Sequence, residues 1–296
     1  MHRSAVERAL FVRRGALGDT LLVAAVLRAW RRTLPAGTEL VLAGVHDHVA
    51  LLQHAGLVDR AVSSEDFAVW SPERLRMQLA GYRWLVADDP AFVAAGPPGG
   101  RAFDPRPRGG EPLPLQVAAQ LDLRLDWPAD QRLVLPATRA ANHAANHAAA
   151  AAGRVLLAPG SGAVAKCWPG PRWLELAARL HAQGWPVAVL VGPVERDRDD
   201  PRRWAWPVPI AFAEPAHAKA LAHELAAAFA FVGNDSGPTH LAAMLGCTTV
   251  ALFGPSDVRV FGPIGPGVHL LPAPHGALDQ LDVDPVTRLV GTVLCR

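Results

Sequence analysis

The sequence contains few cysteines. Among 296 residues there are three, Cys167, Cys247 and Cys295, and no two of them have C-x-x-C spacing. A sparse and odd-numbered set argues against a disulfide framework and against a structural zinc site. It is typical of a protein in a reducing compartment, so we expect a cytoplasmic location.

The sequence also lacks a charge excess and a long hydrophobic run. The 29 lysines and arginines are balanced by 27 aspartates and glutamates, which leaves a formal charge of +2. Nothing global therefore indicates binding to nucleic acid or to an anionic membrane. The longest uncharged apolar run near the start, residues 21–27, is too short to span a bilayer, and Arg13, Arg14 and Asp19 argue against a signal peptide. We expect no nucleic-acid partner and only peripheral membrane contact.

The chain length and the alternation of strand and helix patterns predict two α/β domains with parallel sheets. The first half suggests strands over residues 9–12, 39–43 and 84–87, a helix over 20–34 and a loop over 96–114. The second half is more regular, with strands over residues 155–158, 186–191, 229–232 and 248–253 and helices over 171–183, 216–228 and 238–245. Loops at the carboxyl ends of such strands are placed to bind ligands.

An alanine-rich segment separates the two halves. Residues 140–153 predict a solvated helix that leads into a linker. Its His143 and His147 have a metal-binding spacing, but no H-E-x-x-H glutamate accompanies them, and we interpret both as solvated. The predicted division is an N-terminal Rossmann-like domain over 1–140, a linker over 141–153, a C-terminal Rossmann-like domain over 154–278 and a helix over 279–296, for which packing on the N-terminal domain is one option.

The loop over residues 158–169 carries groups suited to an anion. It offers small residues, the hydroxyl of Ser161 and the cation of Lys166, and its backbone amides together with Lys166 can hold a phosphate. The pattern is not a Walker loop. A flexible connection with a solvated lysine is an equally weighted alternative.

A second such loop covers residues 233–243. It places Asp235, Ser236 and Gly237 directly before a helix whose first turn contains His240. An anion here would meet free amides, the positive end of the helix and an imidazole. The alternative is that Asp235 or Ser236 only caps the helix and that His240 is a surface residue.

Two further acids are candidates for function. Asp19 lies at the start of the first predicted helix, where it is either an N-cap or an ionised general base for a hydroxyl. Glu195 follows a strand end and can bind ribose hydroxyls, with an exposed loop acid as an equal alternative.

Three motifs in order carry a family resemblance. They are Gly-Ala-Leu-Gly-Asp-Thr at residues 15–20, Pro-Gly-Ser-Gly with Lys-Cys-Trp-Pro within residues 159–169, and Asn-Asp-Ser-Gly-Pro-Thr-His-Leu-Ala at 234–242, which continues into residues 252–257. Together they resemble glycosyltransferase family 9, the bacterial heptosyltransferases that build the lipopolysaccharide inner core.

The resemblance implies a GT-B fold, with two Rossmann-like domains facing each other across a cleft. It implies that Asp19 deprotonates the acceptor hydroxyl, that Ser161 and Lys166 hold the donor diphosphate, and that residues 235–240 line the donor pocket. The implied reaction is an inverting, metal-independent transfer without a cofactor. Heptose would pass from ADP-heptose to a saccharide or glycolipid hydroxyl, with peripheral contact at the cytoplasmic face of the inner membrane.

Some features leave alternatives open. The segment after Asp88 is short and proline-rich, so Arg101, Arg106 and Arg108 are either acceptor contacts or, with more weight, a solvated loop. An epimerase-type or nicotinamide-dependent nucleotide-sugar enzyme on the same architecture is a rival interpretation, but no G-x-G-x-x-G fingerprint follows the first predicted strand of this sequence. A family member with another donor or acceptor, or without turnover, is a further alternative.

Overall fold

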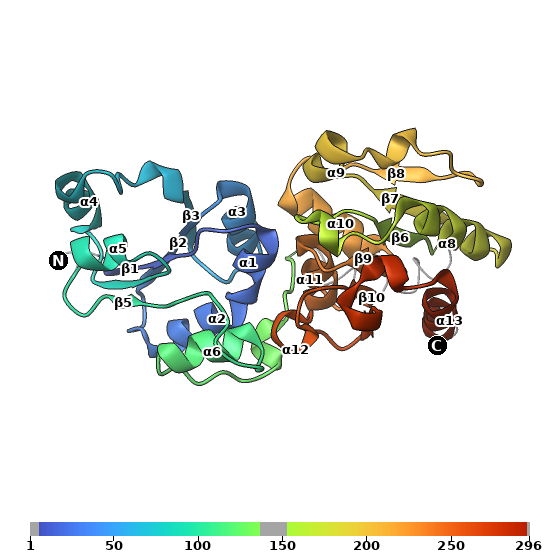
Figure 1. Ribbon diagram of the computed structural model, residues 1–296. Helices are drawn as coiled ribbons and strands as arrows, with labels where there is room; N and C mark the ends of the chain where they lie inside the picture. The colour runs from blue at the N-terminus through green and yellow to red at the C-terminus, as the bar shows by residue number, and fades with distance from the viewer. Residues whose placement is uncertain (1–5, 137–152, 295–296) are drawn as a thin grey trace. The chain divides into compact units, whose positions relative to one another are not determined.

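The computed structural model describes residues 6–136 and 153–294, and the chain divides into two compact units, Met1–Gln131 and Arg132–Arg296. Each unit is built on a parallel sheet with helices packed against it (Figure 1). The predicted fold class, α/β with two Rossmann-like domains, is therefore confirmed. The alanine-rich segment predicted as a helix and linker, with His143 and His147, lies outside the described residues, as does Cys295.

The described part of the first unit has one sheet in the order β3-β2-β1-β4-β5. Its strands are β1 (Arg8–Val12), β2 (Glu39–Gly44), β3 (Arg60–Ser63), β4 (Trp84–Ala87) and β5 (Arg101–Ala102). The central strands are continuous apolar runs, fully buried over residues 9–12 and 40–43, because helices cover both faces of a parallel sheet. The chain leaves β1 toward β2 and later reaches β4 on the other side, so β1 and β4 flank the position where this fold class binds ligands.

The helices of the first unit differ from the prediction at one important point. The single helix expected over residues 20–34 is two helices, α1 (Leu17–Leu22) and α2 (Ala24–Thr33), interrupted at Val23 with φ −91° and ψ 3°. Because α1 begins at Leu17, Asp19 lies inside its first turn and not at its N-cap. Residues 96–114, expected as loop, contain β5 and the start of α6. The remaining helices are α3 (His46–His54), α4 (Pro72–Leu79), α5 (Pro90–Ala95) and α6 (Leu113–Gln120).

Within the described residues, the sheet of the second unit has the order β11-β10-β9-β6-β7-β8. Its strands are β6 (Val155–Ala158), β7 (Val187–Leu190), β8 (Ala211–Ala213), β9 (Ala230–Asn234), β10 (Thr248–Phe253) and β11 (Val268–Pro272). The edge strands β8 and β11 were not predicted, because they are partly exposed and lack the apolar run of a buried strand. Winding reverses between β6 and β9, which places a ligand crevice there.

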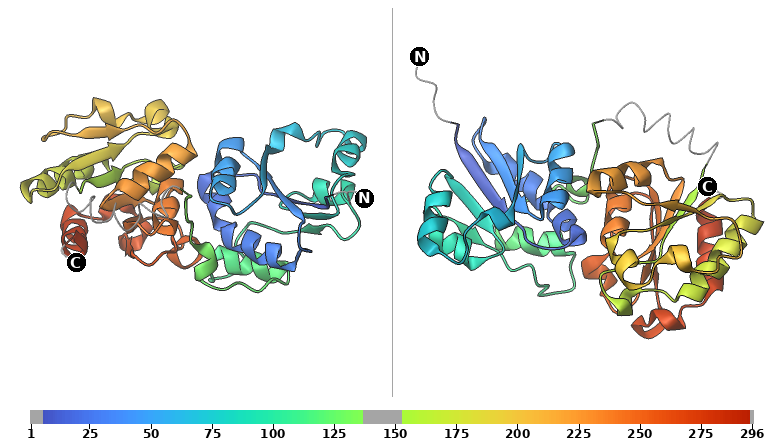
Figure 2. Two further views of the ribbon diagram at one scale, coloured as in Figure 1. Left: turned by 180° about the vertical axis from the view of Figure 1, so that it is seen from behind. Right: turned by 90° about the horizontal axis from the view of Figure 1, so that it is seen from above.

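The helices of the second unit cover both faces of its sheet (Figure 2). They are α8 (Gly170–Ala182), α9 (Pro193–Arg198), α10 (Ala218–Ala227), α11 (Gly237–Met244), α12 (Val258–Phe261) and α13 (Val283–Leu294). Helix α8 packs with α13, and α10 packs with α11. Val286 and Val290 of α13 are buried in the same core as Trp168 and Trp173, whose rings meet edge to face at 5.1 Å. The apolar face of this C-terminal helix thus belongs to the core of the second unit, and the predicted domain boundaries stay a prediction.

Candidate functional site

The two loops predicted to bind an anion meet at the carboxyl ends of β6 and β9. These strands are neighbours, with Ala158 opposite Gly233. The fully buried side chain of Asn234 joins the loops: its Nδ2 donates to the carbonyl of Pro159 at 2.6 Å, and its Oδ1 accepts from the amide of Trp168 at 3.1 Å. Asn234 belongs to the third family motif but was given no role there; in the structure it fixes the relative position of the two loops.

Asp235 brings three predicted site residues together. Its carboxylate lies 2.7 Å from Nζ of Lys166 and 3.7 Å from Nε2 of His240, and its backbone carbonyl accepts a 2.7 Å hydrogen bond from Ser161. Burial raises the pKa of Asp235, but hydrogen bonds with His240, Lys166 and Ser256 outweigh that effect and hold the pKa at about 2. Asp235 is therefore ionised at neutral pH and pairs with Lys166. This pairing argues against the alternative of a flexible connection with a solvated lysine, and phosphate binding by Lys166 stays a prediction.

The start of α11 forms one side of this cluster. Ser236 is its N-cap residue and Gly237 its first residue, but the Ser236 hydroxyl lies 3.1 Å from Oγ1 of Thr239 and makes no hydrogen bond to the helix amides. The His240 side chain is only 7% exposed and faces Asp235. A capping role for Asp235 and a surface position for His240 are both wrong. The positive end of α11 lies directly beside the pair formed by Lys166 and Asp235.

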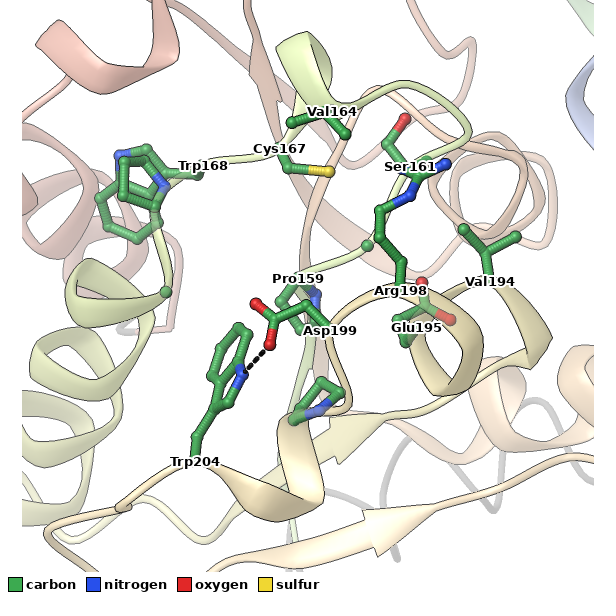
Figure 3. Close-up of a pocket in the computed structure, with 14 residues that line it drawn as sticks. Pro159, Ser161, Val164, Cys167, Trp168, Val194, Glu195, Arg198, Asp199 and Trp204 are labelled. Carbon is green, nitrogen blue, oxygen red and sulfur yellow. Dashed lines mark hydrogen bonds between the residues drawn. The ribbon is translucent and has the colours of Figure 1, made fainter.

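A pocket of about 310 Å³ adjoins the Ser161 loop (Figure 3). Glu195 lines it and also caps the start of α9, because its Oε2 accepts from the amide of Gly192 at 2.8 Å. A Cβ placed on Gly160 would lie 1.5 Å from Oε1 of Glu195, so the glycine leaves the space that this carboxylate occupies. The structure therefore combines a local capping role for Glu195 with a position in the pocket wall.

Three residues that sequence analysis did not single out complete the pocket. Arg198 donates to the carbonyls of Ser161 and Gly162, each at 3.0 Å, and so holds the predicted phosphate loop. The ring of Trp204 forms one wall, and its Nε1 donates to Asp199 at 2.9 Å (Figure 3). Their sequence positions carry no motif, because only the fold of the second unit brings them to the loop.

In the first unit Asp19 lies in the first turn of α1, the helix that follows β1. Its Oδ2 accepts from the amide of Ala16 at 3.0 Å, and its Oδ1 lies 3.0 Å from Nη2 of Arg13. A Cβ on Gly15 would approach the Asp19 Cβ to 2.7 Å, which requires glycine at that position. Burial lowers the pKa of the nearby His48, and this effect exceeds the increase in pKa caused by a hydrogen bond with the Gly15 backbone and by the negative charge of Asp19. Asp19 stabilises the start of its helix through the Ala16 amide. Its side chain is 44% exposed, so the carboxylate is also accessible from solvent.

The arginines after Asp88 are paired within the first unit. Arg101 donates to the carbonyl of Leu121 and to Asp122, whereas Arg106 and Arg108 both bind Asp104, whose pKa they hold below its usual range. Their hydrogen bonds favour the interpretation of a self-paired, solvated loop over that of acceptor contacts.

Neither a metal site nor a membrane span is visible in the described ranges. Residues 6–136 and 153–294 contain no group of three or more His, Cys, Asp or Glu side chains that could hold a metal ion. In the same ranges no helix has both the length and the hydrophobicity that crossing a membrane requires.

Comparison with known sequences identifies relatives. The family model for glycosyltransferase family 9 (heptosyltransferase) matches residues 114–282. Lipopolysaccharide heptosyltransferase 1 of Pseudomonas aeruginosa is 38% identical over 109 residues, which are 36% of this chain and 30% of that protein. Lipopolysaccharide heptosyltransferase 3 of Escherichia coli is 29% identical over 110 residues, 35% of this chain and 32% of that protein. The chain thus matches about a third of the length of these curated relatives.

Solved structures extend the likeness to nearly the whole chain. E. coli heptosyltransferase WaaC with ADP superposes with a TM-score of 0.71 at 18% identity, covering 97% of this chain and 99% of that one. A family 9 glycosyl transferase from Veillonella parvula DSM 2008 gives 0.78 at 15% identity, covering 98% and 97%. At these identities the likeness establishes the fold, which is GT-B.

Proposed function

The chain belongs to glycosyltransferase family 9, and on that premise we propose that it transfers a sugar, heptose from ADP-heptose, to a saccharide or glycolipid hydroxyl in lipopolysaccharide synthesis. The observation that carries the proposal lies in the second unit. Lys166, the N-terminal end of α11 and Ser161 converge at the crevice between β6 and β9, beside a pocket of about 310 Å³.

In this proposal the crevice holds the diphosphate and the pocket holds the nucleoside. One Nζ hydrogen bond of Lys166 goes to Asp235, and an ammonium group has three donors, so two are available to phosphate oxygens. Glu195, in the pocket wall, would accept hydrogen bonds from ribose hydroxyls. A volume of this size lies within the range of small-molecule pockets.

The same groups would assist departure of the nucleotide. When the bond between the anomeric carbon and the β-phosphate oxygen breaks, negative charge develops on ADP. Lys166 and the dipole of α11 would stabilise that charge, which gives the reaction a cation source without a metal ion. Asp235 fixes Lys166 for this task through their 2.7 Å contact.

Acceptor activation is assigned to Asp19. Its exposed carboxylate would accept the proton of the acceptor hydroxyl while the hydroxyl oxygen attacks the anomeric carbon on the face opposite ADP. The new glycosidic bond forms as the phosphate bond breaks, and the anomeric centre inverts. If the acceptor is a glycolipid, the protein would meet it peripherally at the cytoplasmic face of the inner membrane.

A donor panel tests the proposal. ADP-heptose and a set of ADP-, GDP- and UDP-hexoses are each incubated with deacylated, heptose-free bacterial lipopolysaccharide, and products are analysed by mass spectrometry. The proposal predicts addition of one heptosyl unit from ADP-heptose. Transfer from other donors only would assign a different donor, and absence of transfer from every donor would overturn the proposed activity.

A further inference from the structure

The exposed Asp19 rests on a buried ion pair. Strands β1 and β4 are neighbours, with Val12 opposite Ala87, and the residues that directly follow them are Arg13 and Asp88. Nη1 of Arg13 lies 2.9 Å from Oδ2 of Asp88, and their side chains are only 6% and 5% exposed. The pair therefore bridges the two strands at the carboxyl edge of the first sheet, where winding reverses.

The burial and the hydrogen bonds of Arg13 argue against a role in binding a substrate phosphate. All three guanidinium nitrogens are engaged: Nε donates to the Asp19 carbonyl at 3.3 Å, Nη1 to the Arg14 carbonyl and Asp88, and Nη2 to the Asp19 carboxylate at 3.0 Å. Turning this buried guanidinium toward an incoming anion would break the hydrogen bonds that it already makes. It can orient the carboxylate that it already contacts.

The contacts of Asp19 show what this orientation achieves. Oδ1 is held by Arg13 and Oδ2 by the amide of Ala16, so the plane of the carboxylate is fixed from two sides. Asp88 in turn fixes Arg13 and accepts from the Arg14 amide at 3.0 Å. Oδ1 of Asp88 is buried without a hydrogen-bond partner among the described residues, an unfavourable arrangement that stability alone does not explain.

We propose that Arg13 and Asp88 are positioning residues, which hold the Asp19 carboxylate in the orientation needed to accept the proton of the acceptor hydroxyl. The inference rests on the proposed function, because it assigns Asp19 as the base. Neither Arg13 nor Asp88 would touch the substrate. Their effect would be on turnover and not on donor affinity, since a misplacement of about 1 Å in a reacting group costs roughly 100-fold in rate.

The choice of variant follows from the burial of the pair. Removing one partner leaves an uncompensated buried charge and threatens folding, whereas replacing both by apolar residues of similar volume is often tolerated. The test variant is therefore Arg13→Met/Asp88→Leu, with Arg13→Lys as the conservative variant. Arg31→Met is the matched control, because Arg31 also bridges a carbonyl, of Thr38, and a carboxylate, of Asp59, in the same unit.

Full-length proteins are assayed with ADP-heptose and deacylated, heptose-free lipopolysaccharide, and ADP binding is measured by calorimetry. We expect kcat of the double variant to fall about 100-fold, with the KM for ADP-heptose and the Kd for ADP unchanged. Arg13→Lys should lose less, because it keeps the charge but not the fork of donors. Arg31→Met should match the wild type. An unchanged kcat in the double variant, or an equal loss in Arg31→Met, would overturn the inference.

Adding Asp19→Asn to the double variant separates positioning from a general structural role. If Arg13 and Asp88 act through Asp19, the triple variant is no slower than Asp19→Asn alone, because residues that act as a unit are not additive. If the kcat losses of the double variant and of Asp19→Asn multiply in the triple variant, the inference is wrong. A wild-type protein that transfers no sugar would overturn the proposed function itself, and that result is seen before any variant is compared.

Discussion

Replacing Lys166 by alanine should weaken the binding of ADP much more than the binding of adenosine. In the structure the Nζ of Lys166 is anchored 2.7 Å from a carboxylate that is 6% exposed, so the ammonium group is held in place before a ligand arrives. A preplaced cation adds a charged hydrogen bond to phosphate of about 1.5–3 kcal/mol. At 1.4 kcal/mol for each factor of ten, the Kd for ADP should rise about 10- to 150-fold.

Adenosine lacks the diphosphate, so its affinity should change little. Isothermal titration calorimetry with ADP and adenosine measures both effects on the same protein preparation. Lys219→Ala is the control, because Lys219 lies in the first turn of α10 and belongs to neither of the two loops that meet at the crevice. Equal losses of affinity for ADP and adenosine, or no loss for either, would show that Lys166 does not bind the phosphates.

A second variant tests whether the negative charge of Asp235 faces the diphosphate. Lys166→Ala removes the cation that pairs with Asp235, so this carboxylate, with its remaining partners His240 and Ser256, faces the incoming diphosphate and repels it. Lys166→Ala/Asp235→Asn removes that repulsion and should bind ADP more tightly than Lys166→Ala alone. The reverse order would show that Asp235 does not face the diphosphate.

Three further outcomes are expected. Transfer activity should survive excess EDTA, since Lys166 and α11 supply the positive charge; loss that magnesium restores would refute this. The pKa of Asp235 is lowered from 3.8 to about 2, so it adds about 2 kcal/mol of stability above pH 4 that is lost as the pH falls from about 4 toward 2. The gap in unfolding free energy between wild type and Asp235→Asn, from urea titrations at several pH values, should shrink over that window, and a constant gap would refute the assignment. Gly160→Ala must displace Glu195 and should weaken ADP binding about 2- to 10-fold, but it should have no effect in a Glu195→Ala background. Equal effects in both backgrounds would show that Gly160 does not act through Glu195.

The parallel strands and the phosphate loops were predictable because their signals are local. Residues 9–12 of β1 and all of β6 are continuous apolar runs, and the loops around Ser161 and Asp235 carry small and polar residues next to helix starts. The partly exposed edge strand β8 has no such run and was missed. The break at Val23 was also missed, because the residues around it favour a helix and the interruption is visible only in the backbone angles.

The pairings within the sites were not predictable, because they depend on strand order. Lys166 and Asp235 are 69 residues apart and meet only because β9 lies beside β6. Arg13 and Asp88 meet for the same reason at β1 and β4. Trp204 reaches the pocket through the fold of the second unit and not through a motif.

The most direct test of the account is the kcat of Asp19→Asn at saturating ADP-heptose and acceptor. Asparagine keeps the size of the side chain and can still accept a hydrogen bond from Ala16 or Arg13, so the protein should fold and bind ADP like the wild type. A neutral amide cannot take the proton of the acceptor hydroxyl, and base removal costs on the order of 10²- to 10⁴-fold in rate. The account predicts a kcat at least about 100-fold below that of the wild type, with an unchanged Kd for ADP. A variant that keeps more than about a tenth of the wild-type kcat would show that Asp19 only supports its helix, and would contradict the mechanism.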